Sequence, residues 1–147
     1  DLLGEIRDQK FVLDWASSYE EGQKAIAARV HDIYFLDYRL GSQTGLKLLK
    51  ESIAAGCKIP MILLTGFGEH EIDIEAMQVG AADYLSKDQI NPTLLERSIR
   101  YSIYRMHNLE ALREREAQIL MQDRLASIGL LASSLAHEIG TPLGVIR

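Results

Sequence analysis

Three short apolar runs constrain the fold of this chain more than any other feature. They cover residues 33–36, 60–64 and 82–85, and stretches of helical length and amphipathic pattern separate them. The run at residues 33–36 is continuous, as expected for a strand that is buried on both faces. The alternation of the three runs with helices is typical of a parallel sheet. The sequence therefore predicts an α/β protein with an open parallel sheet.

The remaining elements of this first part follow from the same patterns. Ser17 and Ser18 are candidate caps for a helix, and Gly80 is a usual helix-ending residue. One further short strand is predicted at residues 11–13. The predicted helices cover residues 1–9, 19–30, 45–55 and 71–79.

The last third of the chain reads as one long helix. Pro92 suits a first helical turn, and nothing interrupts helical character from there to Gly129. Residues 105–124 are rich in Glu, Arg and Gln with sparse leucines, which indicates a solvated coiled-coil connector. We therefore expect an α/β domain over residues 1–105, a helical linker over 106–124, and the start of another helical domain over 125–147.

Composition excludes several classes of protein. The net charge of −5 disfavours nucleic acid as the main partner, because phosphate backbones call for basic surfaces. No apolar run approaches the roughly 18 residues that a membrane-spanning helix needs. The single cysteine, Cys57, fits a reducing compartment. We expect a soluble, cytoplasmic protein without a membrane segment.

A polar residue follows each of the three apolar runs: Asp37, Thr65 and Lys87. Ligands of open parallel sheets bind beyond the carboxyl ends of the strands, so the fold brings these residues together. A carboxylate, a hydroxyl and an ammonium together suit a phosphoryl group. Asp37 can be the nucleophile, Thr65 can donate a hydrogen bond to a phosphoryl oxygen, and Lys87 can neutralise its charge.

These residues and their neighbours carry a resemblance to a known family. The segments 32–40, 64–66 and 80–87 resemble a response-regulator receiver domain, over about residues 1–105. The resemblance implies a flavodoxin-like (CheY-like) fold with Asp37 as phosphoacceptor. It makes Thr65 the switch hydroxyl, Lys87 the phosphate-contacting lysine, and Tyr84 the aromatic side chain that rotates on activation.

The resemblance also implies a magnesium ion. Asp37 and the backbone carbonyl of Arg39 would be two of its ligands. Receivers begin with a strand that ends in two acidic metal ligands, and that strand would precede Asp1. We therefore expect an N-terminally truncated receiver whose first strand belongs between the strands at 11–13 and 33–36.

Two other interpretations of this first part are weaker. Each of the three polar residues alone would be read as a strand-terminating residue, but all three in register favour a site. A nucleotide or flavin binder of the same fold is disfavoured, because no glycine-rich phosphate loop follows any of the strands.

A second motif surrounds His137 on the long helix. An apolar stripe lies on one face, and at about 100° per residue His137 points away from its centre. An exposed neutral imidazole is a competent nucleophile, and the adjacent Glu138 could accept its proton. A zinc-protease motif is excluded, because it needs a second histidine at the position of Thr141. The stripe comprises Leu125, Ile128, Leu131, Leu135, Ile139, Leu143 and Ile146.

The segment 133–143 resembles the H-box of the dimerisation and phosphotransfer domain of sensor histidine kinases. That resemblance implies that His137 is the phosphorylated residue, Glu138 its general base and Thr141 the position that orients water for dephosphorylation. Gly140 replaces the basic residue that is usual in the family.

The two resemblances together predict a hybrid-type histidine kinase in a two-component phosphorelay. ATP would be needed only by the full-length protein, because no ATP-binding lobe is present in this chain. The expected partners are a second copy through the long helix, the kinase's ATP-binding domain and cognate phosphorelay proteins. The alternative is a receiver that acts as a phosphorylation-controlled dimerisation or binding module without kinase activity.

Overall fold

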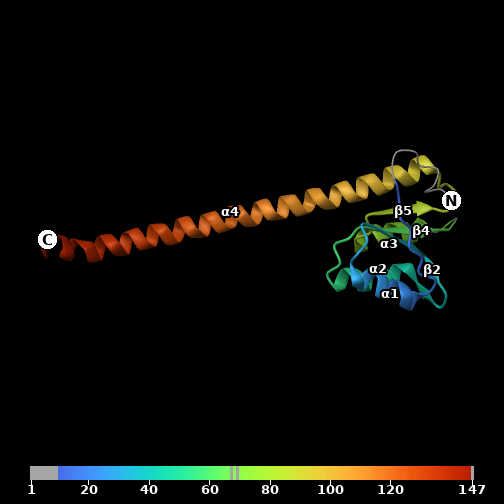
Figure 1. Cartoon of the computed structure of the whole chain (residues 1–147), viewed down its shortest axis with the longest axis horizontal. Helices are drawn as coiled ribbons and strands as arrows, with labels where there is room; N and C mark the ends of the chain where they lie inside the picture. The colour runs from blue at the N-terminus through green and yellow to red at the C-terminus, as the bar shows by residue number, and fades with distance from the viewer. Residues whose placement is uncertain (1–9, 67, 69, 147) are drawn as a thin grey trace. The chain divides into compact units, whose positions relative to one another are not determined.

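The structure is a computed structural model that describes residues 10–66, 68 and 70–146, with side chains described as far as residue 134 (Figure 1). The helix predicted at residues 1–9 lies outside the described residues. The chain divides into two units, residues 1–107 and 108–147, and each is described by itself.

The first unit contains a parallel sheet of three strands in the order β1-β4-β5. These are β1 (Tyr34–Asp37), β4 (Met61–Thr65) and β5 (Asp83–Ser86). The predicted strands at 33–36, 60–64 and 82–85 are thus confirmed with a shift of one residue. In the register, Asp37 lies beside Leu64 and Thr65 beside Ser86, so the three strands end at the same edge.

Helices cover both faces of this sheet (Figure 1). On one face, α1 (Tyr19–Ala28), α2 (Gly45–Ala54) and α3 (His70–Val79) contribute to one apolar core. On the other face, the first turns of α4 (Pro92–Ile146) form a second core through Leu95 and Ile99. The middle strand β4 belongs to both cores, because Met61 and Leu63 face one of them and Ile62 faces the other.

Side chains cap two of these helices where they begin. The Ser18 hydroxyl accepts a hydrogen bond from the backbone of Glu21 at the start of α1. The Thr44 hydroxyl accepts one from Lys47 at the start of α2. Such caps satisfy backbone N–H groups that a helix leaves without a partner. Ser18 was a predicted cap.

The strand predicted at residues 11–13 does not form. Phe11 packs against the core under α4, whereas Val12 is 92% exposed. A strand needs a neighbour for its backbone groups. Among the described residues, β1 is hydrogen-bonded on one side only, to β4, so nothing there pairs with residues 11–13. The prediction of a strand at residues 11–13 is therefore wrong.

A small antiparallel hairpin follows β1 and was not predicted. It pairs β2 (Arg39–Leu40) with β3 (Gln43–Thr44). Gly41 occupies the turn with a φ of 64°, a conformation that glycine adopts without steric cost. Gly-Ser between two short runs is a recognised hairpin turn, so the signal was present in the sequence.

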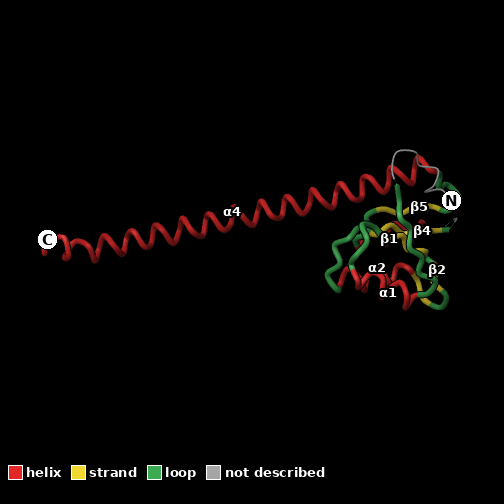
Figure 2. The backbone as a smooth tube through the Cα atoms, viewed as in Figure 1, coloured by secondary structure: helices red, strands yellow, loops and turns green. Residues whose placement is uncertain are grey.

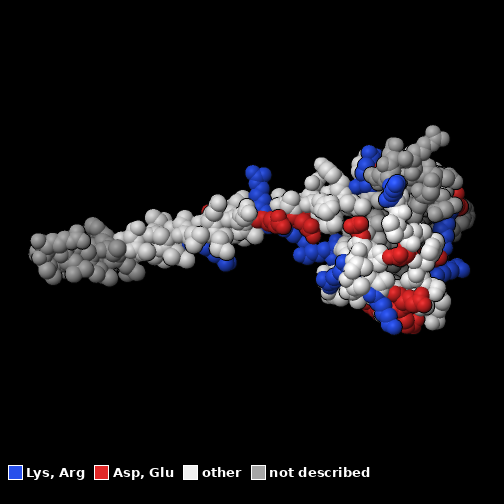
Figure 3. All heavy atoms as spheres, viewed as in Figure 1, with Lys and Arg blue, Asp and Glu red and all other residues white. Residues whose placement is uncertain are grey.

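The long helix is present as α4, which spans 55 residues and continues through Gly129 (Figure 2). Its start packs on the sheet, where Ser98 and Ser102 are each 3% exposed. In the second unit, the described apolar side chains are exposed, and charges of both signs lie on the helix (Figure 3). No helix within the described residues is long and apolar enough to cross a membrane.

Candidate phosphoacceptor site

Asp37 ends β1 with its carboxylate held on both oxygens. Oδ1 accepts a hydrogen bond from the backbone N–H of Arg39 at 3.2 Å. Oδ2 lies 2.7 Å from Nζ of Lys87, and both side chains are partly exposed. The carboxylate is therefore oriented, accessible and next to a positive charge, as a nucleophile for phosphoryl transfer requires.

Lys87 follows β5 and is positioned through the middle strand. Its backbone N–H donates to the carbonyl oxygen of Thr65 at 2.9 Å, which continues the pairing of β5 with β4. The side chain then reaches Asp37 on β1. The sequence prediction that Asp37 and Lys87 meet at one edge of the sheet is confirmed by this contact.

Thr65 lies at the same edge, but its hydroxyl points elsewhere. The side chain is 1% exposed, and Oγ1 donates to Oδ1 of Asp73 on α3 at 3.0 Å. Asp73 is itself 9% exposed. The structure thus pairs Thr65 with a carboxylate that sequence reasoning missed, because an acidic residue in the first turn of a helix looks like an ordinary favourable contact with the helix dipole.

Gly45 is a second residue of the site that the sequence did not reveal. It begins α2, and its backbone N–H donates to the carbonyl of Tyr38 at 2.8 Å. A Cβ atom at Gly45 would lie 2.2 Å from the backbone oxygen of Asp37. Only glycine allows α2 to begin this close to the end of β1, where Asp37 lies.

Tyr84 lies on β5 with its side chain 36% exposed. The neighbouring Asp83 accepts a hydrogen bond from the Ser98 hydroxyl at 2.6 Å, which ties β5 to the start of α4. Tyr84 therefore stands on a strand that connects the site edge with α4. Its role as a rotating switch stays a prediction.

The magnesium prediction rests on Asp37 and Arg39. A carboxylate and a backbone carbonyl are the hard oxygen donors that magnesium prefers, and magnesium keeps several water ligands. Within the part of the chain that the structure describes, no group of three or more His, Cys, Asp or Glu side chains could hold a metal ion. Asp37 and Arg39 thus fit a magnesium shell in kind and would supply a part of it.

His137, Glu138 and Thr141 lie on α4 beyond the residues whose side chains the structure describes. No contact of these three side chains can be stated. The roles predicted for them from the H-box resemblance stay predictions.

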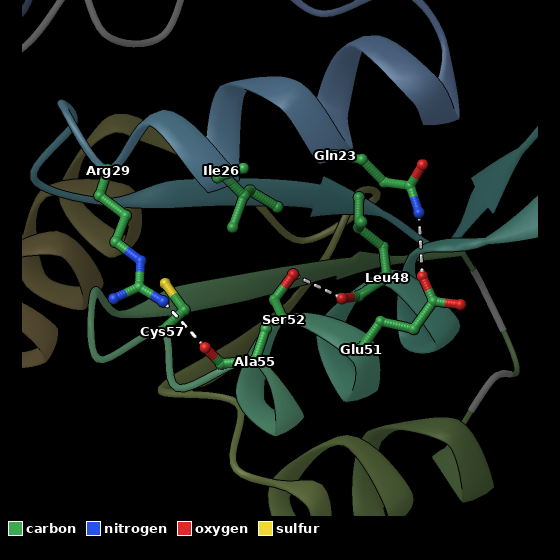
Figure 4. Close-up of a pocket in the computed structure, with 9 residues that line it drawn as sticks. Gln23, Ile26, Arg29, Leu48, Glu51, Ser52, Ala55 and Cys57 are labelled. Carbon is green, nitrogen blue, oxygen red and sulfur yellow. Dashed lines mark hydrogen bonds between the residues drawn. The ribbon is translucent and has the colours of Figure 1, made fainter.

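A separate pocket of about 270 Å³ lies between α1 and α2 (Figure 4). Its polar groups are paired with one another or with the backbone: Gln23 donates to Glu51 at 3.1 Å, and Arg29 donates to the carbonyl of Ala55 at 2.9 Å. Ser52 donates to the carbonyl of Leu48 at 2.7 Å. The pocket is lined by none of Asp37, Thr65 and Lys87. The contacts of Gln23 and Arg29 link the α1 side to the α2 side, whereas the contact of Ser52 lies within α2.

Tyr19 and Glu51 form a titratable pair beside this pocket. The Tyr19 hydroxyl donates to the Glu51 carboxylate at 2.5 Å. Burial and this hydrogen bond raise the pKa of Tyr19 to about 12. The same hydrogen bond lowers the pKa of Glu51.

Comparison with known proteins agrees with this geometry. Residues 2–100 match the response regulator receiver domain. The chain is 30% identical over 117 residues to the transcriptional regulatory protein FixJ of Azorhizobium caulinodans, covering 71% of this chain and 54% of FixJ. It is 26% identical over 134 residues to the transcriptional regulatory protein DltR of Streptococcus agalactiae, covering 91% of this chain and 54% of DltR.

A solved structure supports the same conclusion about the fold. The receiver domain of a response regulator from Clostridium thermocellum is 29% identical and superposes with a TM-score of 0.59 over 64% of this chain and 75% of that one. The chain belongs to the response regulator receiver domain family. It has the flavodoxin-like fold and a long C-terminal helix, and it spans about half the length of FixJ and DltR.

The prediction that this chain is a fragment of a histidine kinase is wrong. The matching family is the receiver domain, and the relatives FixJ and DltR are transcriptional regulatory proteins. The expectation that the full-length protein needs ATP depended on the kinase prediction and is not supported either. The error arose because the H-box resemblance rests on a short segment, and an apolar stripe of this kind favours helix pairing in many classes of protein.

Proposed function

We propose that the first unit is a phosphorylation switch in which Asp37 accepts a phosphoryl group within a two-component phosphorelay. The observation that supports this most directly is the contact of Asp37 with Lys87 at 2.7 Å. It places a positive charge where the charge of a transferred phosphoryl group would develop. Family membership supports the same role.

The proposed step is an in-line displacement. A carboxylate oxygen of Asp37 attacks the phosphorus of a phosphodonor and forms a new P–O bond. The bond between phosphorus and the donor breaks, and the donor leaves with that electron pair. Lys87 turns from the carboxylate towards the phosphoryl oxygens, because the product carries more negative charge there than the carboxylate carried.

Magnesium belongs to the same proposal. Asp37 and the carbonyl of Arg39 are the residues of this chain that would hold the ion. When bound, the ion supplies positive charge that offsets the charge of the phosphoryl group. Arg39 also fixes the carboxylate through its backbone N–H.

The test is labelling of the intact protein by a small acyl phosphodonor in the presence of magnesium. We expect one label that hydroxylamine removes, because hydroxylamine cleaves acyl phosphates, and Asp37→Asn should abolish it. His137→Gln should leave the label in place. A label that persists in Asp37→Asn, or that disappears in His137→Gln, would show that Asp37 is not the phosphoacceptor.

We further propose that α4 carries the output as a pairing helix. The apolar side chains of Leu125, Ile128 and Leu131 are 60%, 60% and 65% exposed, and they recur at three-residue steps. Such a stripe is buried when a second helix packs on it. The simplest partner is the same helix of a second copy, in a two-fold parallel dimer.

A further inference from the structure

The Thr65 hydroxyl and the Asp73 carboxylate form a buried contact between the end of β4 and the first turn of α3. Their separation is 3.0 Å, and the two side chains are 1% and 9% exposed. A charge-assisted hydrogen bond in such surroundings is stronger than one between neutral groups in water. The contact therefore fixes the direction of the Thr65 hydroxyl.

A threonine hydroxyl carries one proton and can donate it to one acceptor at a time. While Thr65 donates to Asp73, it does not donate to a phosphoryl group on Asp37. In the role predicted for it from the sequence, Thr65 donates its hydroxyl proton to that phosphoryl group. The hydroxyl must therefore leave Asp73 when Asp37 is phosphorylated.

We propose that Asp73 is a positioning residue that holds Thr65 in the unphosphorylated arrangement and thereby opposes phosphorylation of Asp37. This inference rests on the proposed phosphoacceptor role of Asp37. When Thr65 turns away, the buried carboxylate of Asp73 loses a donor, and such a loss is costly. Because Asp73 belongs to α3, phosphorylation of Asp37 would change the hydrogen bonding, and with it the stability, of that helix.

The matched comparison is Glu75 on the same helix. Its carboxylate is paired with Lys50 at 2.8 Å, but the side chain is 49% exposed. If Glu75 loses Lys50, water can bind its carboxylate instead, whereas the carboxylate of Asp73 is surrounded by protein. Glu75→Ala is therefore a control for loss of an acidic side chain from α3.

The experiment measures the ratio of phosphorylated to unphosphorylated protein at limiting phosphodonor, in the intact protein with magnesium. We expect Asp73→Ala to raise this ratio roughly tenfold, because the competing hydrogen bond is gone. Glu75→Ala should leave the ratio within about twofold of the unchanged protein. Asp73→Asn should give a smaller increase, because its amide oxygen still accepts the hydroxyl but carries no charge.

A double substitution separates positioning from a general structural effect. Thr65→Val lacks the hydroxyl, so adding Asp73→Ala to it should change the ratio by less than about twofold. An equal effect of Asp73→Ala with and without the Thr65 hydroxyl would overturn the proposal. If Asp73→Ala does not fold, an unchanged or lowered ratio in Asp73→Asn would overturn it as well.

The two proposals fail in different ways. A label that persists in Asp37→Asn contradicts the phosphoacceptor role and removes the basis of the Asp73 inference. A label that Asp37→Asn abolishes, together with an unchanged ratio in Asp73→Ala, contradicts only the role of Asp73.

Discussion

The ammonium of Lys87 lies 2.7 Å from the carboxylate of Asp37, although fifty residues separate them in sequence. Asp37 ends β1 and Lys87 follows β5, and these strands are not neighbours, since β4 lies between them. The contact crosses the end of the middle strand. The site therefore exists only when all three strands are in register.

Lys87→Ala should slow phosphorylation of Asp37 by roughly a hundredfold, because it removes a preorganised positive charge. The rate of label incorporation from a small phosphodonor measures this. Lys50→Ala is the control: both lysine side chains are 49% exposed, and Lys50 pairs with Glu75 at 2.8 Å. Equal rates in the two variants would contradict the role of Lys87.

Gly45→Ala should destabilise the first unit by roughly 1–3 kcal/mol, because the new methyl group overlaps a backbone atom that cannot rotate away. The overlap is with the carbonyl oxygen of Asp37 at 2.2 Å. Urea denaturation measures the change. In the control Gly22→Ala, the new methyl group lies 3.2 Å from a terminal methyl of Leu48.

The Gly22→Ala control should shift stability by less than about 1 kcal/mol, because alanine favours the helix and Leu48 can adjust. A Gly45→Ala protein as stable as this control would show that α2 can move away from β1 at little cost.

The stability of the first unit should fall as the pH rises from about 10 towards 12. The pKa of Tyr19 is raised from 10.0 to about 12 in the folded protein. Below pH 10 the hydroxyl is protonated in both the folded and unfolded states, so its contribution to stability is fully present. Above pH 10 the unfolded chain releases the proton before the folded protein does, so the free energy of unfolding decreases. Denaturation midpoints on either side of pH 10 measure the loss.

Two variants test whether Tyr19 and Glu51 are responsible. Tyr19→Phe should show a smaller loss of stability over the same pH range. Glu51→Gln should lower the pKa of Tyr19, because the carboxylate favours the protonated hydroxyl. The difference in tyrosinate absorbance between proteins with Tyr19 and with Tyr19→Phe follows that pKa, and an unshifted titration in Glu51→Gln would show that Glu51 does not raise it.

The intact protein should sediment as a dimer, and Ile128→Asp or Leu131→Asp should dissociate it by placing a charge in the paired stripe. Leu130→Asp is a matched control. Leu130 is 71% exposed, but at about 100° per residue it lies on the opposite side of the helix. A monomer before substitution, or a dimer that survives both stripe substitutions, would contradict pairing through α4.

Strand order, helix positions and the meeting of Asp37 with Lys87 could be predicted because each depends on a local pattern. An apolar run predicts a buried strand, and the geometry of a parallel sheet then determines which residues lie at the same edge. The run at residues 11–13 misled for the same reason. Of its three residues only Phe11 packs against the core, beneath α4, and whether an apolar residue pairs in a sheet depends on which neighbours are available.

Asp73 and Gly45 could not be predicted, because their importance lies in what approaches them in space. Asp73 is one of two acidic residues in the first turn of α3, and only the fold selects it to receive the Thr65 hydroxyl. Gly45 opens a helix, where glycine is unremarkable in sequence. The kinase prediction was wrong for a different reason. It rested on a short motif, and a motif has a function only together with the residues that surround it in three dimensions.

The sharing of β4 between the two cores links distant parts of the first unit energetically. Met61 and Leu63 pack under α1 and α2, Ile62 packs under α4, and the strand ends at Thr65. Amide hydrogens of β4 should exchange with solvent only through global opening, because neither face can separate while the other holds. We therefore expect a molecule that binds the start of α4 also to slow the fluctuations of the sheet edge at which Asp37 lies.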